Sequence, residues 1–267
     1  MNRIGTYEKK PFTLTRQNIT LISGEGKKRL AVHSLIELDV TSARERIRLQ
    51  KENGCDISFT GWIIKCVAQA VHDHPSLNAY RQGRRKMVIF DDVDIPIPIE
   101  RDGEDDSRVL PYIIRRADKK TVLEITQEIR AVQHEKITDK TQVLGKNLTR
   151  FERWIVHAPL FIKKLLMRMI RYQGVLKKKY IGTVGVTSIG MKGRFSGWVI
   201  PLGGPVAVLC VVCGIQKKPG VVDNRIEIRE YLHMTVTVDH AVIDGGPLAR
   251  FLDRLTELIE NAHGLSE

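Results

Sequence analysis

The chain has 267 residues, of which 42% are hydrophobic, and its formal net charge at pH 7 is +12. This length can bury a large core and suits a single mixed α/β domain over residues 1–267. Because residues 1–10 are polar and charged, we expect no secretory signal peptide, and Pro201–Pro205 would break a membrane-spanning helix within the uncharged stretch Phe195–Gln216. We expect two strands joined by a turn in that stretch.

The four cysteines predict neither a disulfide framework nor a metal site. Cys210 and Cys213 lie three apart in an apolar run typical of a strand, so their side chains should face opposite sides of a sheet. Cys55 and Cys66 are expected to be small buried or incidental residues. The cysteine pattern therefore indicates a reduced, cytoplasmic protein.

Periodicity predicts the secondary structure before residue 135. We expect strands at 31–41, 93–99 and 109–114, and helices at about 42–53, 59–72 and 121–134. Thr41 or Ser42 is expected to cap the first of these helices, and Gly54 to end it. The acids Glu104–Asp106 are expected to form a solvated turn, and no metal is assigned to them.

Most of the positive charge lies in one segment. Between Lys146 and Lys179 there are ten Lys or Arg residues and one acid, so this segment carries +9 of the net charge of +12. Apolar residues of 160–170 alternate with Lys163, Lys164 and Arg168 at helical spacing, which predicts a basic amphipathic helix.

Three interpretations of the basic segment stay open. The helix could pack on the protein's own body, or residues 146–179 could contact a membrane surface or an acidic partner, or they could bind nucleic acid. The sequence argues against nucleic acid, because no recognised nucleic-acid motif accompanies the charge.

The stretch from Met234 to Pro247 organises the end of the chain. Apolar and polar residues alternate over 234–239, as in a half-buried strand, and this parity predicts that His240 points inward against packed side chains. Asp244 and two glycines follow, and a helix from about Pro247 places six apolar residues on one face. These are Leu248, Phe251, Leu252, Leu255, Leu258 and Ile259.

Two stretches resemble a known family. Residues 239–252, Asp-His-Ala-Val-Ile-Asp-Gly-Gly-Pro-Leu-Ala-Arg-Phe-Leu, resemble the His-x-x-x-Asp-Gly signature of the chloramphenicol acetyltransferase-like superfamily. They are most similar to its dihydrolipoamide acyltransferase branch, the acyltransferase core of 2-oxoacid dehydrogenase complexes. Residues 182–191 resemble that branch's Gly-Thr-Phe-Thr-Ile-Ser-Asn-Leu-Gly-Met. The resemblance covers about residues 10–260, except 101–108 and a basic insertion at about 137–180.

The resemblance implies catalytic roles for three residues. His240 would be the general base that takes a proton from the attacking group. Thr187 matches the family's serine and would donate a hydrogen bond to the tetrahedral oxyanion. Asp244 would hold the geometry of the loop, for example by pairing with an Arg, and a plain carboxylate at the start of the helix stays open as the alternative.

The resemblance also implies residues around the substrate. Ser188, at the position of the family's asparagine, and Gly245 would lie near it. In this family an Arg of the N-terminal segment reaches the Asp of the motif. Arg16 is the position that most resembles this Arg, Arg29 is a rival candidate, and a solvated surface role for Arg16 stays open.

The implied fold is a two-layer α/β sandwich with a mixed sheet, of the chloramphenicol acetyltransferase type. The family forms trimers with active sites at subunit interfaces, so we expect a homotrimer. Coenzyme A would be the acyl-carrying substrate, and the lipoyl group would be carried on a separate protein, since we expect no lipoyl or subunit-binding domain before this core.

The predicted function is therefore coenzyme A-dependent acyl transfer to a thiol of the dihydrolipoamide kind or to a hydroxyl acceptor. Two alternatives stay open. The chain could be a catalytically silent trimeric scaffold or partner-binding protein of the same fold, or an acyltransferase for a small hydroxylated molecule, as in the antibiotic-modifying branch.

Overall fold

The structure is a computed structural model, and it describes residues 5–100, 109–134, 154–155, 158–190 and 195–265. The acidic turn predicted at 104–106 and residues 137–153 of the predicted insertion lie outside the described residues.

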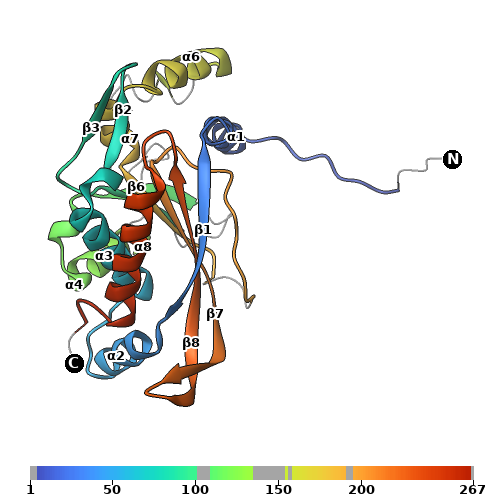
Figure 1. The fold of residues 1–267 in the computed structure, drawn as a ribbon. Coiled ribbons are helices and arrows are strands. Elements are labelled where there is room, and N and C mark those ends of the chain that lie inside the picture. Colours follow the sequence, from blue (N-terminus) through green and yellow to red (C-terminus); the bar gives the residue numbers. More distant parts are fainter. Residues whose placement is uncertain (1–4, 101–108, 135–153, 156–157, 191–194, 266–267) are drawn as a thin grey trace.

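A four-stranded mixed sheet forms the centre of the fold, in the order β1-β8-β7-β6 (Figure 1). Its strands are β1 (Ala31–Asp39), β6 (Val184–Ser188), β7 (Val208–Val222) and β8 (Arg225–Asp239). β8 pairs antiparallel with β1 and β7, whereas β6 pairs parallel with β7. The long β7–β8 hairpin turns at Asp223 and Asn224, whose positive φ angles of 46° and 61° suit a tight turn between antiparallel strands.

Helices cover one face of this sheet and give the fold two layers (Figure 1). They are α2 (Thr41–Glu52), α3 (Phe59–Asp73), α4 (Val122–His134) and α8 (Gly245–Glu260). Along α3, nine residues from Gly61 to Val71 are buried, as its apolar sequence predicts. The predicted face of α8 is confirmed, since five of its six apolar residues are buried and Leu252 packs partly buried against the same core.

The remaining elements surround these two layers. Two hairpins are formed by β2 (Ala79–Gln82) with β3 (Lys86–Ile89), and by β4 (Ile95–Glu100) with β5 (Val109–Ile114). Short 3₁₀ helices are η1 (Pro75–Leu77) and η2 (Ala117–Lys119), and further helices are α1 (Leu14–Gly26), α6 (Leu160–Ile170) and α7 (Gly174–Ile181). The β4–β5 pair confirms the predicted strands. In the described parts of the chain, no helix is both long and apolar enough to cross a membrane.

Two local predictions are wrong. Residues 195–216 contain one strand, not two, because β7 begins at Val208 and the preceding residues are irregular. Within them, the indole of Trp198 donates to the carbonyl of Ile36 (3.0 Å). The cap of α2 is also different: the carboxylate of Asp39 accepts from the N–H (2.9 Å) and the hydroxyl (2.6 Å) of Thr41. The carboxylate of Asp39 thus satisfies the first N–H group of the helix, and neither Thr41 nor Ser42 is the cap, since Val40 occupies the N-cap position without a side-chain hydrogen bond.

Candidate active site

His240 lies directly after β8, where the strand turns toward α8. Its N–H donates to the carbonyl of Leu30 (2.8 Å), and the N–H groups of Val242 and Ile243 turn back to the carbonyl of Asp239 (2.9 and 3.0 Å). The inward direction predicted for His240 is wrong, because half of its side chain is exposed. Because the chain turns after Asp239, the side chain that enters the core is that of Ile243, which is 2% exposed.

The hydrogen bonding of His240 determines which ring nitrogen carries the proton. Its Nδ1 lies 2.9 Å from the carbonyl oxygen of Ile243. A carbonyl only accepts, so in the neutral ring Nδ1 must donate and Nε2 keeps its lone pair. The turn therefore leaves Nε2 as the proton-accepting nitrogen of a half-exposed imidazole.

Asp244 lies four residues after His240 and occupies the N-cap position of α8. Its side chain is 88% exposed, makes no capping hydrogen bond, and has one carboxylate oxygen 3.9 Å from Nδ1 of His240. This distance is too long for a hydrogen bond. The Arg expected on Asp244 lies elsewhere, since Arg16 is an exposed residue of α1 and Arg29 pairs with another carboxylate.

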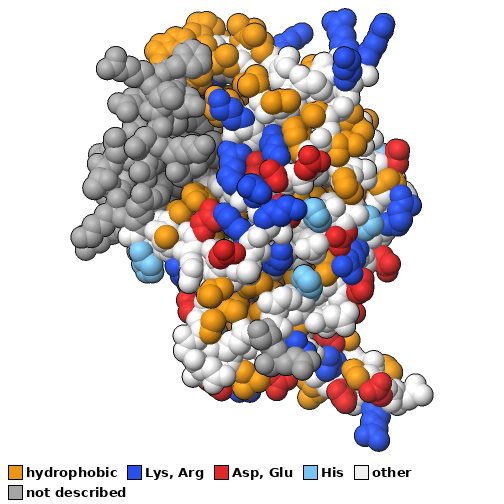
Figure 2. All heavy atoms as spheres, turned by 90° about the vertical axis from the view of Figure 1, so that its left-hand side faces the viewer, with side chains coloured by type: hydrophobic (Ala, Val, Ile, Leu, Met, Phe, Trp, Pro, Cys, Tyr) orange, Lys and Arg blue, Asp and Glu red, His pale blue; other side chains and the backbone are white. Residues whose placement is uncertain are grey.

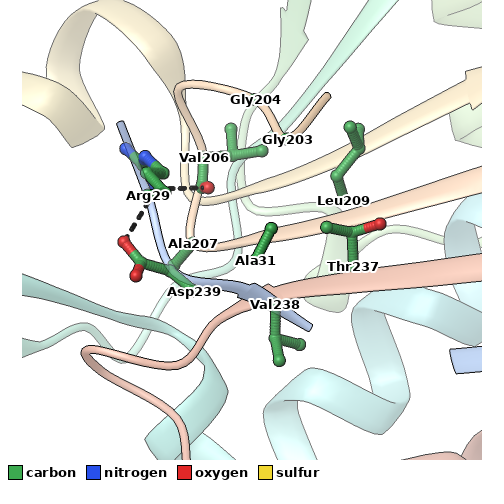
Figure 3. A pocket seen from close by; sticks show the side chains of 10 residues that line it. All are labelled: Arg29, Ala31, Gly203, Gly204, Val206, Ala207, Leu209, Thr237, Val238 and Asp239. Atoms are coloured by element: carbon green, nitrogen blue, oxygen red, sulfur yellow. Dashed lines mark hydrogen bonds and ion pairs between the residues drawn. The ribbon is translucent and has the colours of Figure 1, made fainter. Parts of the chain in front are cut away.

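Arg29 binds the base of the His240 loop (Figure 3). Its guanidinium lies 3.4 Å from the carboxylate of Asp239 and donates to the backbone carbonyls of Pro205 and Val206. The Asp239 carboxylate also accepts from the N–H of Ala241 (3.2 Å). Both charged side chains are largely buried, at 13% and 15% exposed. Arg29, the rival candidate, and Asp239, which the sequence did not single out, therefore hold the loop that carries His240.

A small cavity beside this ion pair has a volume of about 10 Å³. Arg29, Thr237, Asp239 and the glycines 203 and 204 contribute to its lining (Figure 3). Gly203 has a φ angle of +81°, and a Cβ on Gly26 would lie 2.7 Å from its carbonyl oxygen, so this close approach needs both glycines. The volume is that of about one water molecule, so an acyl substrate does not fit there.

Thr187 and Ser188 lie at the end of β6 and point to opposite faces of the sheet, as neighbouring strand residues do. The hydroxyl of Ser188 is buried and has no hydrogen-bond partner among the described residues. Thr187 is partly exposed and pairs in register with Val211, which pairs in turn with Thr235 of β8. Gly245 begins α8 and is exposed, and a Cβ built on it would meet nothing within 4 Å.

The sheet register separates Thr187 from His240 within one chain. Thr187 is level with Thr235, five residues before His240, and two strand spacings away from it across the sheet. At roughly 3.3 Å per residue and 4.8 Å per strand, this places the two side chains on the order of 20 Å apart. One chain therefore does not bring its own Thr187 to its own His240.

Lys177 is a buried charged residue that the sequence did not single out. It lies on α7, is 8% exposed, and its ammonium group lies 4.6 Å from the centre of the Tyr80 ring. Burial, together with the nearby positive charge of Arg29, lowers the pKa of Lys177 to about 7. A packed charge on α7 thus lies near the base of the His240 loop.

The sulfur and carboxylate side chains give no metal site in the ranges that the structure covers. No group of three or more His, Cys, Asp or Glu residues is placed there to hold a metal ion. The cysteines are free, and burial raises the pKa of Cys210 to about 12, so its thiol stays protonated and inert.

Most of the chain matches a known protein family. The family model for the catalytic domain of 2-oxoacid dehydrogenases acyltransferase matches residues 13–145 and 176–266. The chain is 28% identical over 234 residues to the lipoamide acyltransferase component of the branched-chain alpha-keto acid dehydrogenase complex of Bacillus subtilis. That match covers 85% of this chain and 46% of the relative, so the chain spans about half of the relative's length.

Two solved structures confirm the predicted fold. The dihydrolipoamide acetyltransferase of Azotobacter vinelandii, a structure concerned with a serine, a histidine and an asparagine in its catalytic mechanism, superposes with a TM-score of 0.70 at 19% identity. It covers 97% of this chain and 94% of its own. A chloramphenicol acetyltransferase superposes with a TM-score of 0.51 at 12% identity, covering 94% of this chain and all of its own. The chain therefore has the chloramphenicol acetyltransferase-like fold.

Proposed function

Because the chain belongs to the family of 2-oxoacid dehydrogenase acyltransferase catalytic domains, we propose that it transfers an acyl group between coenzyme A and an acceptor thiol. The acceptor is a dihydrolipoamide-like thiol carried on a separate protein. The alternative acceptor is a hydroxyl group, which the same residues would serve. Support comes from the Bacillus subtilis relative, which is a lipoamide acyltransferase component.

The observation that carries the proposal is the hydrogen bond from Nδ1 of His240 to the carbonyl of Ile243. It fixes the tautomer in which Nε2 accepts a proton, which a general base requires. The half-exposed ring is open to a substrate, and the open space in front of Gly245 leaves room for one beside it.

The reaction follows from these groups. Nε2 of His240 takes the proton of the attacking thiol, and the resulting thiolate attacks the carbonyl carbon of the acyl thioester. The hydroxyl of Thr187 donates a hydrogen bond to the oxyanion that forms. When the tetrahedral intermediate collapses, the carbon–sulfur bond to the leaving thiol breaks, and the leaving thiolate takes the proton from His240.

The active site is formed by two copies of the chain. His240 and Thr187 of one chain lie on the order of 20 Å apart by the sheet register, so both reach one thioester only if a neighbouring copy supplies Thr187. A homotrimer with a head-to-tail interface repeats this arrangement at three sites. The neighbouring copy also covers the exposed face of His240 and excludes water from it.

Other assignments complete the proposal. Ser188 and Gly245 lie at the substrate, and the buried hydroxyl of Ser188 has no hydrogen-bond partner among the described residues. Asp244 lies at the exposed surface of the His240 loop. Residues 1–267 form a single catalytic domain with an insertion at about 137–180, and the family model leaves 146–175 unmatched. The protein acts in the cytoplasm, where its free cysteines stay reduced.

The test is steady-state acyl transfer from acetyl- and branched-chain coenzyme A to dihydrolipoamide. His240→Ala should remove at least about 100-fold of the rate, because the proton acceptor is lost, while coenzyme A binding stays nearly unchanged. His134→Ala is the matched control, since His134 is exposed at the end of α4. If the wild type transfers to no thiol or hydroxyl acceptor and His240→Ala melts like the wild type, the chain is a silent scaffold.

A further inference from the structure

Helix α6 packs on the body with one side, where Ile162, Leu166, Met167 and Ile170 are partly buried beside the buried Lys163. Lys163 is 5% exposed, and its ammonium donates to the side-chain oxygen of Asn18 on α1 (3.0 Å). Just after α6, the guanidinium of Arg171 donates to both carboxylate oxygens of Glu25 (2.8 and 3.1 Å). The predicted helix is therefore confirmed, but both of its sides carry apolar residues: Lys163 lies on the inner side, and Lys164 and Arg168 lie on the outer side.

A row of large apolar side chains on α6 faces outward. Phe161, Leu165 and Met169, which follow one another at four-residue spacing, are 71%, 58% and 64% exposed. Such a stripe of large apolar side chains on a helix that is already docked by its other side is the sign of an interaction surface. Hydrophobic side chains gather at the top of Figure 2, the height at which α6 lies in Figure 1.

Basic side chains flank this stripe. Lys164 and Arg168 are exposed and lie one turn apart beside Phe161 and Leu165. Residues 154–181 contain no Asp or Glu, and of their seven Lys or Arg residues Lys164, Arg168 and Lys179 are exposed. Apolar residues bordered by cations only are typical of helices that lie in the surface of an anionic membrane.

A second basic element lies at the same end of the molecule. The tip of the β2–β3 hairpin carries Arg84, Arg85 and Lys86, all exposed. The hairpin is attached just beyond α6, since the N–H of Gly83 donates to the carbonyl of Tyr172 (2.6 Å) and Gln82 bonds the side chain of Gln173 (3.0 Å). Figure 1 shows the hairpin and α6 side by side at the top of the molecule.

We infer that the α6 surface, defined as Phe161, Leu165, Met169, Lys164 and Arg168 with the hairpin tip 84–86, binds a membrane containing anionic phospholipid. The apolar stripe enters the boundary between headgroups and acyl chains, while the cations on both elements attract the lipid phosphates and carboxylates. Membrane binding through this surface is independent of acyl transfer.

Two other occupants fit this surface less well. A second copy of this chain would bring another positively charged surface, from a protein of net charge +12, against the same cations. A nucleic acid would meet the cations but would leave the protruding Phe161 and Leu165 without an apolar partner, because the outer surface of a nucleic acid is phosphate and sugar.

The experiment is co-sedimentation with vesicles of phosphatidylcholine alone and with vesicles that also contain phosphatidylserine. The wild type should bind the mixed vesicles and not the neutral ones. Lys164→Glu with Arg168→Glu should lower binding by about 25-fold or more, since each Lys or Arg at an anionic surface contributes about fivefold. Phe161→Ser with Leu165→Ser should lower it by about tenfold or more.

Matched controls use exposed residues of other elements. Arg48→Glu with Lys51→Glu reverses two charges on α2, and Ile226→Ser with Ile228→Ser removes two apolar side chains, 80% and 76% exposed, from the β7–β8 hairpin. Both control pairs should bind like the wild type. All the altered side chains are exposed, so every variant should fold. Melting temperatures check this.

Three results would overturn membrane binding. The first is equal binding to both kinds of vesicle or to neither. The second is full vesicle binding by the Phe161→Ser and Leu165→Ser variant together with binding of a single-stranded oligonucleotide by the wild type, which would make the surface a general polyanion site. The third is a lower oligomer mass for that variant, which would make the stripe a contact between copies.

Discussion

The guanidinium of Arg29 lies 3.4 Å from the carboxylate of Asp239, the residue directly before His240. Arg29 also donates to the carbonyl of Val206 (2.6 Å), so it joins the His240 loop to the segment before β7. One largely buried ion pair therefore fixes where the base of the loop lies, while the imidazole itself stays half exposed.

Arg29→Met should destabilise the chain, because it leaves the largely buried carboxylate of Asp239 without its countercharge and the carbonyls of Pro205 and Val206 without their donor. The free energy of unfolding should fall by on the order of 3 kcal/mol. Arg16→Met, an exposed change on α1, should stay within about 0.5 kcal/mol of the wild type. Urea denaturation measures both, and equal effects would show that Arg29 does not hold the loop.

Thr187 is expected to act through its hydroxyl alone. Thr187→Ser keeps this group and should retain most of the turnover, whereas Thr187→Val, which keeps the shape, should lose about 10²- to 10³-fold in kcat. Steady-state acyl transfer measures both changes, with melting temperatures as the control for folding. A Thr187→Val enzyme as fast as the Thr187→Ser enzyme would mean that Thr187 is not the oxyanion donor.

Asp244 is expected to contribute little to the stability of the chain. It is 88% exposed and makes no capping hydrogen bond, so Asp244→Ala should change the free energy of unfolding by less than about 0.5 kcal/mol. The rate should fall by at most about fivefold, because an exposed charge pair is worth at most about 1 kcal/mol. A loss of 100-fold would instead assign Asp244 a direct role in the assembled site.

Lys177 should give the chain a pH-dependent stability. Burial lowers its pKa from the ordinary 10.5 to about 7 in the folded chain. Between these two values the unfolded chain holds a proton that the folded chain lacks, so the free energy of unfolding rises with pH across this window. Lys177→Met should therefore be more stable than the wild type at and below pH 7, by a margin that shrinks as the pH approaches 10.5.

Urea denaturation at several pH values tests this dependence. Lys179→Met is the matched control, since Lys179 lies on the same helix and is exposed, and it should follow the wild type at every pH. A constant difference between Lys177→Met and the wild type across the window would show that Lys177 keeps an ordinary pKa.

The sequence predicted those features that depend on neighbours within one element. The apolar face of α8 appears in the structure, because period 3.6 follows directly from backbone geometry. The strand before His240 is present as β8, but the half-buried alternation predicted for it is wrong, since residues 232–238 are all buried, including the polar Thr235 and Thr237. The direction of His240 did not follow, because it depends on the turn that begins at Asp239 and on the hydrogen bonds of that turn.

Other features depend on contacts between distant segments. The pairing of Arg29 with Asp239 joins residues that only the folded sheet brings together, so the sequence left Arg16 and Arg29 as rivals. In the same way, the helical pattern of 160–170 predicts an apolar and a basic side. Which residues face the body depends on contacts with α1, where Asn18 binds the inward Lys163 and Glu25 binds Arg171 just after the helix.

The central claim is that one active site contains His240 of one copy and Thr187 of another, and mixed assemblies test it most directly. His240→Ala and Thr187→Val, each nearly inactive alone, are co-expressed with separable tags, and the mixed assemblies are purified and assayed for acyl transfer. Every mixed trimer then contains one site with both wild-type residues. Random mixing should restore roughly one quarter of the wild-type rate per chain in the unfractionated pool. Activity of the mixed assemblies no higher than that of the two variants alone would contradict an active site shared between copies.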